Sequence, residues 1–240
     1  MRILAQPAYV LHARAWRETS LLVEVLTRDH GRVGLVARGL SGPKKHALRA
    51  ALQPLQSLRI DFLPRGELAR LLQAEAQDAA PLLTGDRLMA AFYVNELMLR
   101  LLPRGDVSPE LFALYGRVRD ELADARALAW NLRRFERDLL ELLGYGLPWD
   151  TLGEGEPVHA ATRYRLDPER GPVADPRRAE GSISGAALLA LASDREPDAG
   201  LLTELRLGLR DVLATHLGGT GLRSWGLMGE LARVRTRAQD

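Results

Sequence analysis

The chain has 240 residues, enough for one large domain or two modest ones, and its 46% of apolar residues is typical of a globular protein. It contains no cysteine, which excludes disulfides, thiol catalysis and thiolate metal sites. No apolar run approaches the roughly 18–20 residues that span a bilayer, and the N-terminus lacks a signal-peptide pattern. We therefore expect a cytoplasmic protein without a membrane partner.

The net charge of +2 is unevenly distributed along the chain. Residues 1–80 contain 12 Lys and Arg against 7 Asp and Glu, whereas the remainder contains 21 against 24. Six basic residues and a single acid lie between Arg28 and Arg49. A solvated basic loop is the commonest reason for such a cluster, but a phosphate-bearing partner is the functional alternative.

The first 80 residues have the period of β-strands. Alternation is clearest where Leu58, Ile60 and Phe62 share one face. Other strands are expected at 8–14, 20–27, 32–38 and 68–76, with Leu68, Arg70, Leu72, Ala74 and Ala76 on one face of the last. Residues 29–31 are expected to form a hairpin turn, and residues 39–43 a glycine loop. Five short strands predict a small closed barrel such as the OB-fold, because closure removes exposed edges.

Beyond a break at 81–85 the apolar period becomes helical. Helices are expected at 86–102, from Ser108 onward, and at 128–143, 188–191, 198–217 and 222–234. The first of these is apolar almost all round, which predicts a buried helix. Residues 151–185 are rich in Gly, Pro and charge and are expected to form an irregular insertion, with a possible strand at 162–166. The predicted fold is α+β, with an OB-fold barrel at 1–80 and an all-helical domain at 81–240.

No pattern of catalytic residues is present. The sequence has no Gly-x4-Gly-Lys-Ser/Thr loop and no Gly-x-Ser-x-Gly elbow, and its five histidines have no metal-ligand spacing. Glu136 and Asp138 would point about 200° apart on a helix, so we interpret them as part of a solvated face. These observations predict a protein that is not an enzyme and has no cofactor.

The clustered cations are the remaining functional signal. Arg38, Lys44, Lys45 and Arg49 flank the glycine loop, and Arg14, Arg17 and Arg70 are weaker candidates in the same half of the chain. Such a set can neutralise several phosphates of a nucleic acid and release counterions. Aromatic residues are sparse in the predicted barrel, so we expect mostly electrostatic and weakly sequence-selective binding.

Several segments, in order over nearly the whole chain, share their pattern with one known family. They are Tyr9–Ser20, Gly31–Gly39, Leu48–Pro54, Tyr93–Leu97, Arg133–Glu136, Leu142–Gly146 and Leu217–Ser224. In these segments the chain resembles the RecO family of bacterial repair proteins. Many relatives carry a four-cysteine zinc site after the Leu-Gly-Tyr motif. The corresponding segment here is the insertion at 151–185, which has no cysteine, so we expect no zinc.

The resemblance implies an N-terminal OB-fold followed by a helical domain. It also implies binding to single- and double-stranded DNA and annealing of complementary strands during DNA repair, in the nucleoid-associated part of the cytoplasm. The partners that it implies are RecR and the single-stranded-DNA-binding protein, and through them RecA, which is loaded onto the covered strand.

The resemblance further implies that the helical domain captures the acidic, apolar C-terminal tail of the single-stranded-DNA-binding protein. Such a tail needs a hydrophobic pocket with cations at its rim. On the 128–143 helix, Arg133 lies at the edge of the apolar arc next to Leu140, and Arg223 is a possible second cation. The alternative for Arg133 is a side chain whose stem simply covers the edge of the core.

Two other functions fit a basic barrel. An RNA-binding or ribosome-associated factor would prefer RNA to DNA of equal sequence. A nuclease would need a cluster of metal-binding carboxylates, and we find none in the sequence.

Overall fold

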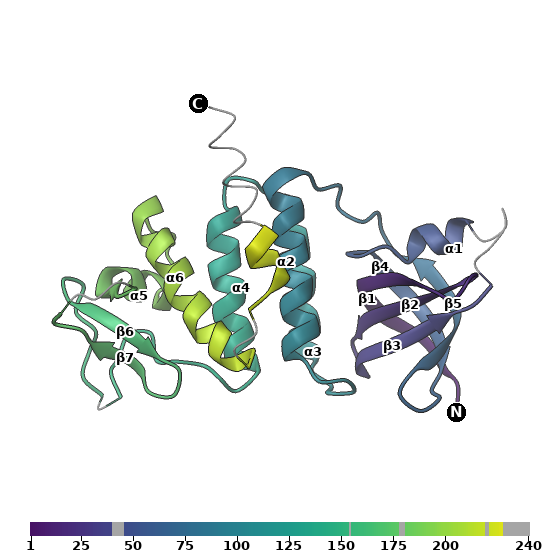
Figure 1. The fold of residues 1–240 in the computed structure, drawn as a ribbon, viewed down its shortest axis with the longest axis horizontal. Coiled ribbons are helices and arrows are strands. Elements are labelled where there is room, and N and C mark those ends of the chain that lie inside the picture. The colour runs from purple at the N-terminus through teal and green to yellow at the C-terminus, as the bar shows by residue number, and fades with distance from the viewer. Residues whose placement is uncertain (40–45, 154, 178–180, 219–220, 228–240) are drawn as a thin grey trace. The chain divides into compact units, whose positions relative to one another are not determined.

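The structure is a computed structural model that describes residues 1–39, 46–153, 155–177, 181–218 and 221–227 (Figure 1). The chain forms two compact units. One comprises Met1–Ala123 together with the chain from Leu222, and the other comprises Asp124–Gly221. The strands end and the helices begin near Pro81, as the change of the apolar period predicts. The boundary between the two compact units lies farther along the chain, at Asp124.

Five strands of the first unit form a closed barrel. They are β1 Ile3–Trp16, β2 Ser20–Thr27, β3 Gly31–Ala37, β4 Ser57–Leu63 and β5 Ala69–Ala76, with α1 His46–Ala51 between β3 and β4. The order β1-β2-β3-β5-β4 closes where β1 pairs with β4. Only the β3–β5 pairing is parallel. The expected OB-like barrel is thus confirmed, and with it the α+β fold.

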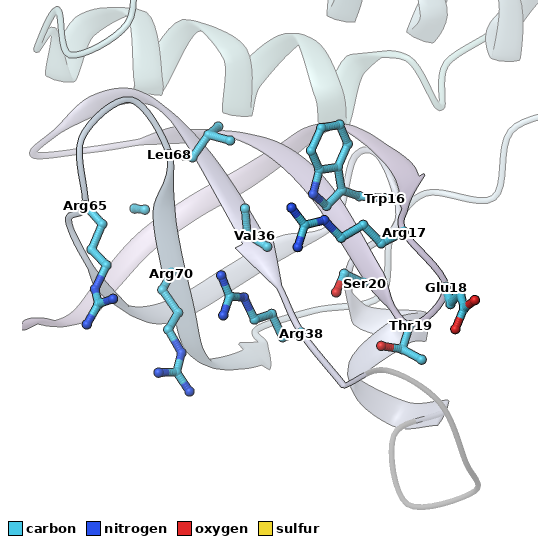
Figure 2. Close-up of a pocket in the computed structure, with 11 residues that line it drawn as sticks. Trp16, Arg17, Glu18, Thr19, Ser20, Val36, Arg38, Arg65, Leu68 and Arg70 are labelled. Atoms are coloured by element: carbon cyan, nitrogen blue, oxygen red, sulfur yellow. The ribbon is translucent and has the colours of Figure 1, made fainter.

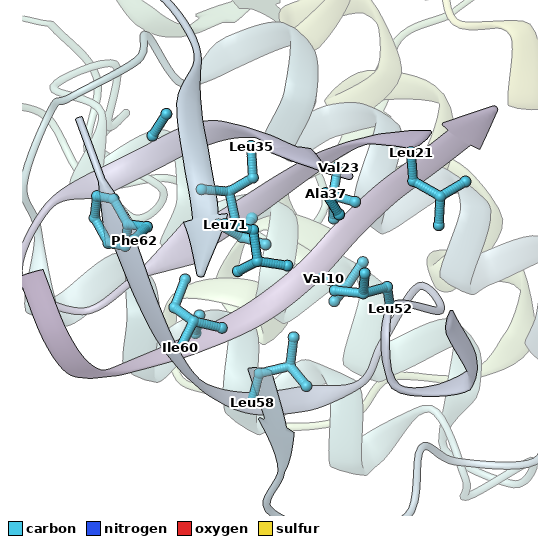
Figure 3. Close-up of a cluster of buried hydrophobic side chains, with 13 residues drawn as sticks. Val10, Leu21, Val23, Leu35, Ala37, Leu52, Leu58, Ile60, Phe62 and Leu71 are labelled. Atoms are coloured by element: carbon cyan, nitrogen blue, oxygen red, sulfur yellow. The ribbon is translucent and has the colours of Figure 1, made fainter. Parts of the chain in front are cut away.

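The barrel is filled by the alternating side chains of its strands. Leu58, Ile60 and Phe62 are at most 2% exposed, and Figure 3 shows them pointing into the same interior as the apolar residues of the other strands. In β5 the expected single face is wrong, because Leu71 is buried whereas Arg70 is exposed. The register of β4 and β5 shifts between Asp61 and Phe62, so a bulge in β5 reverses the alternation.

Short connections join the strands. Residues 17–19 form the turn between β1 and β2 (Figure 2). The turn at 28–30 ends at Gly31, which has a positive φ of 62°, in agreement with the expected hairpin. Residues 64–68 connect β4 to β5. Most of the expected glycine loop, with Lys44 and Lys45, falls outside the described residues.

Two helices, α2 Gly85–Leu101 and α3 Pro109–Glu121, complete the first unit. The hydroxyl of Ser108 accepts a hydrogen bond from the Leu111 N–H at 3.1 Å, which confirms the expected N-cap. Helix α3 packs on the barrel through the ring of Tyr9, whose centroid lies 4.8 Å from that of Phe112 and 5.2 Å from that of Tyr115.

Helix α2 differs from the helix expected at 86–102. Leu97 and Met98 are fully buried, but Leu88 is 37% and Phe92 47% exposed in the described part of the chain. Its apolar composition therefore does not mean burial on every side. One turn beyond Phe92, the carboxylate of Glu96 accepts hydrogen bonds from the N–H groups of Arg223 and Ser224 at the start of a helix over 223–227.

The second unit contains α4 Leu128–Leu142, α5 Gly185–Ala192 and α6 Ala199–His216 beside a small sheet. The sheet has the order β7-β6-β8, built from β6 Arg163–Asp167, β7 Gly171–Ala174 and β8 Ile183–Ser184. The expected strand at 162–166 is confirmed as β6. The segment 151–185 also contains β7 and β8, so it is not irregular throughout and the region after residue 81 is not all-helical. The sequence did not indicate these two strands, because they are too short to show alternation.

Candidate nucleic-acid interface

An open pocket of about 820 Å³ lies at one end of the barrel. It is formed where the β1–β2 turn, the end of β3 and the β4–β5 connection meet (Figure 2). Its lining residues are Trp16, Arg17, Glu18, Thr19, Ser20, Val36, Arg38, Arg65, Leu68, Ala69 and Arg70. The volume is within the roughly 300–1,000 Å³ of ordinary ligand pockets.

Four arginines give the pocket its charge. Figure 2 shows Arg17, Arg38, Arg65 and Arg70 in one group, and Glu18 is the single acid among the lining residues. None of the four guanidinium groups has an ion pair or hydrogen bond with any residue that the structure describes. The pocket therefore presents cations that have no counter-charge within the described part of the chain.

Three other arginines of the barrel, Arg2, Arg28 and Arg32, are paired with carboxylates. Arg2 lies 2.8 Å from a carboxylate oxygen of Asp61, and Arg28 lies 2.9 Å from one of Asp29. The carboxylate of Glu24 lies between Arg32 and Arg104 and accepts hydrogen bonds from both. Hydrogen bonds from Arg2 and from the Ala5 N–H lower the pKa of Asp61, with the backbone bond the larger cause. The positive charges of these arginines are thus neutralised by carboxylates, whereas those of the pocket arginines remain available to a ligand.

Local backbone geometry places the pocket arginines. Val36 is paired with Arg70 in the parallel β3–β5 ladder, and Arg38 follows two residues after Val36, which puts it on the same face. Arg17 adopts a positive φ of 55°, which is uncommon for a residue with a Cβ. The tight turn that holds Arg17 also fixes Trp16, which is paired with Ser20 across the hairpin.

The residues expected to contact DNA fall into three groups. Arg17, Arg38 and Arg70 line the pocket. Arg14 lies beside it, with its guanidinium carbon 5.9 Å from the centroid of the Trp16 ring. Arg49 is in α1, outside the lining residues, and Lys44 and Lys45 lie outside the described part of the chain.

Arg65 lines the pocket but was missed by the sequence reasoning. It stands in a Pro-Arg-Gly turn with no basic neighbour, so charge clustering could not find it. The available signal was topological, because the β1–β2 and β4–β5 loops lie together in the binding face of an OB-fold.

The residues expected to capture the tail have a different environment. Arg133 is 5% exposed and donates a hydrogen bond to the carboxylate of Glu136, which is 1% exposed. The interpretation of Glu136 as part of a solvated face was therefore wrong. Two charges spaced i, i+3 on a helix pair with each other, so both can enter an apolar arc.

Leu140 is fully buried in the second unit, whereas Arg223 belongs to the first. The structure describes Arg223 through its backbone N–H, which lies 2.8 Å from a carboxylate oxygen of Glu96. Arg133, Leu140 and Arg223 are thus divided between the two compact units.

Within the described residues, no group of three or more His, Asp or Glu side chains is placed to hold a metal ion. No helix in that part of the chain is long and apolar enough to cross a membrane.

The closed five-stranded barrel, the helix between β3 and β4 and the basic pocket at the barrel's end define an OB-like protein with an added helical region. A family model described as Recombination protein O N terminal matches residues 1–80, and one described as Recombination protein O C terminal matches residues 82–226. The chain belongs to the RecO family of DNA repair proteins.

Relatives match almost the whole length of the chain. It is 54% identical over 240 residues to the DNA repair protein RecO of Xanthomonas euvesicatoria pv. vesicatoria (strain 85-10), covering 98% of this chain and 100% of the relative. It is also 54% identical over 241 residues to the DNA repair protein RecO of Stenotrophomonas maltophilia (strain R551-3), with the same coverage.

Proposed function

We propose that this chain is a DNA-binding recombination mediator whose barrel pocket holds the phosphate backbone of single- and double-stranded DNA. It anneals complementary strands and, with RecR, helps to load RecA onto DNA coated by the single-stranded-DNA-binding protein. Residues 1–80 are the DNA-binding domain and residues 81–240 the helical domain. The proposal includes no catalytic step and places the protein in the nucleoid-associated cytoplasm.

The observation that carries the proposal is the set of unpaired arginines in the pocket. OB-folds bind oligonucleotides on the face of strands 2 and 3 and on the loops that follow strands 1 and 4. The turn at 17–19 and the segment 65–70 occupy those positions. A guanidinium group matches the geometry of a phosphate with two parallel N–H donors, and these four have no carboxylate partner among the described residues to displace.

A matched pair of variants tests the pocket. Arg38→Ala with Arg70→Ala removes two pocket cations, and Arg2→Ala with Arg28→Ala removes two paired cations from the same barrel. For single-stranded DNA the slope of log K against log salt should fall by about 1.4 in the first variant, at ~0.7 per phosphate lost. The second variant should retain the wild-type slope. Equal slopes for both variants, or a preference for RNA of the same sequence, would contradict the proposal.

We propose that DNA also contacts cations outside the pocket, namely Lys44, Lys45 and Arg49. The family membership and the positive charge of these residues support this proposal. In the same salt titration, Lys44→Ala with Lys45→Ala should lower the slope by about 1–2 and weaken binding to all sequences alike. The mediator activity requires its own assay. Strands coated with the single-stranded-DNA-binding protein should anneal faster with the wild-type chain than with the Arg38, Arg70 double variant.

For the acidic tail, we propose a site at Arg133 and Leu140 of the second compact unit, with Arg223 of the first unit as a separate candidate cation. Arg133 would have to exchange Glu136 for a carboxylate of the tail, because its charge is already paired. Binding of an acidic tail peptide should therefore weaken in Arg133→Ala and strengthen in Glu136→Gln, with each variant checked by its melting curve. Unchanged affinity in both variants would remove Arg133 from the site.

A further inference from the structure

Trp16 is the one aromatic residue among the described residues that line the pocket. It is 37% exposed and lines the pocket at the end of β1. The other barrel aromatics are engaged in packing. The ring of Tyr9 packs against the rings of Phe112 and Tyr115, and Phe62 is 2% exposed in the core. Trp16 is thus the barrel aromatic that can offer a ring face to a ligand.

The surroundings of Trp16 hold its ring in place. Its backbone is fixed opposite Ser20 in the β1–β2 ladder, and the tight turn begins at the next residue, Arg17. Arg14 lies over the ring at 5.9 Å from its centroid, a cation–π contact that limits rotation of the indole. An aromatic ring that is oriented before binding loses little conformational entropy when a ligand stacks on it.

We propose that Trp16 stacks on a nucleobase and thereby makes the barrel pocket selective for single-stranded over duplex DNA. The inference rests on the proposed function, because the pocket arginines must first hold the phosphates. Single-stranded DNA can turn a base out onto the ring, whereas the bases of a duplex are stacked and paired with each other. The arginines then provide affinity for any strand, and Trp16 provides discrimination between its two forms.

The chemistry predicts which part of the affinity depends on Trp16. Stacking uses the π-face that all bases possess, so it should be tolerant of sequence. It involves no charge, so the salt dependence of binding should be independent of it. Loss of the ring should reduce affinity for single strands by roughly 5- to 100-fold, the usual range for one base stacked on an aromatic side chain.

The test compares Trp16→Leu and Trp16→Phe with the wild-type chain on three probes. The probes are an oligothymidylate, a duplex of the same length and an abasic strand that has the phosphates without bases. Trp16→Leu should weaken binding to the oligothymidylate alone, and its affinity should approach that of the wild type for the abasic strand. Trp16→Phe should restore most of the loss. A melting curve for each variant checks the fold.

Tryptophan fluorescence gives a second measurement. Trp130 and Trp149 are 6% and 8% exposed in the second unit, and Trp225 does not line the pocket. Quenching by oligothymidylate should therefore disappear in Trp16→Phe. Equal losses on single-stranded and duplex probes, or equal wild-type affinity for abasic and normal strands, would overturn the stacking proposal. If the Arg38, Arg70 double variant also bound like the wild type, the proposed function itself would fail.

Discussion

Arg119 and Arg38 have the same charge and lie in the same compact unit, but their surroundings differ. Arg119 is 5% exposed, and its guanidinium donates to the carbonyl oxygen of Leu55 at 2.6 Å and lies 2.8 Å from a carboxylate oxygen of Asp78. Arg38 is exposed and has no such partner among the described residues. The first arginine joins α3 to the barrel, and the second is available to a ligand.

This contrast predicts opposite effects of the same substitution. Arg119→Ala should lower the free energy of unfolding by about 1–3 kcal/mol, because a buried carbonyl loses its donor. Arg38→Ala should change stability by less than about 0.5 kcal/mol, the range of ordinary surface substitutions. Urea unfolding measures both values, and DNA titration should show the reverse order of effects. A stability loss in Arg38→Ala as large as that in Arg119→Ala would contradict the assignment.

Substitution of two glycines, Gly31 and Gly66, distinguishes the energetic cost of backbone strain from that of a steric clash. Gly31 and Gly66 have similar positive φ angles of 62° and 59°. A Cβ on Gly66 would meet no atom within 4 Å, whereas one on Gly31 would collide with the backbone carbonyl of Asp106. Gly66→Ala should therefore destabilise the protein by about 1–2 kcal/mol through strain alone. Gly31→Ala should cost at least ~2 kcal/mol more, through overpacking. Equal melting temperatures of the two variants would contradict the close approach.

At the scale of elements, Glu96 of α2 caps the short helix at 223–227. Burial by itself would raise the pKa of Glu96, but the N–H groups of Ser224 and Arg223 stabilise the carboxylate and lower the pKa below its ordinary 4.5. A group with a lowered pKa contributes stability above its ordinary pKa and loses it as the pH falls through the lowered value. The docking of this helix should weaken in acid for that reason.

Amide hydrogen exchange tests the cap. In Glu96→Gln the exchange at Arg223 and Ser224 should become roughly 10-fold faster, because hydrogen bonds to a charged acceptor are replaced by weaker ones worth about 1–2 kcal/mol less. In the wild type the local stability of residues 222–227, after correction for intrinsic exchange, should decrease below pH 4.5. No difference between Glu96→Gln and wild type would show that the cap does not hold the helix.

Some strands could be predicted from the sequence alone, and others could not. Alternation at Leu58, Ile60 and Phe62 predicted β4 correctly, because one face of the strand meets the core. In β5 the same reasoning gave one continuous face, since a bulge depends on pairing with β4 and leaves no local signal. In the second unit, β7 and β8 have too few residues for a period to appear.

For the whole molecule, the fold class could be predicted but the site only in part. The order of strands and helices follows from the change of period near Pro81. Charge clustering along the sequence did not indicate Arg65, because its place in the pocket depends on the topology of the closed barrel. Glu136 was misjudged because burial of a charge depends on its partner, here Arg133, and not on its own chemistry.

The central claim is that the barrel pocket binds the DNA strand, and photo-crosslinking with peptide mapping tests it most directly. A single-stranded oligonucleotide with photoreactive thymines should crosslink to peptides that contain Trp16 and the 65–70 segment. The crosslinks should fade in the Arg38, Arg70 double variant. Crosslinks confined to Asp124–Gly221, and unchanged in that variant, would contradict the account.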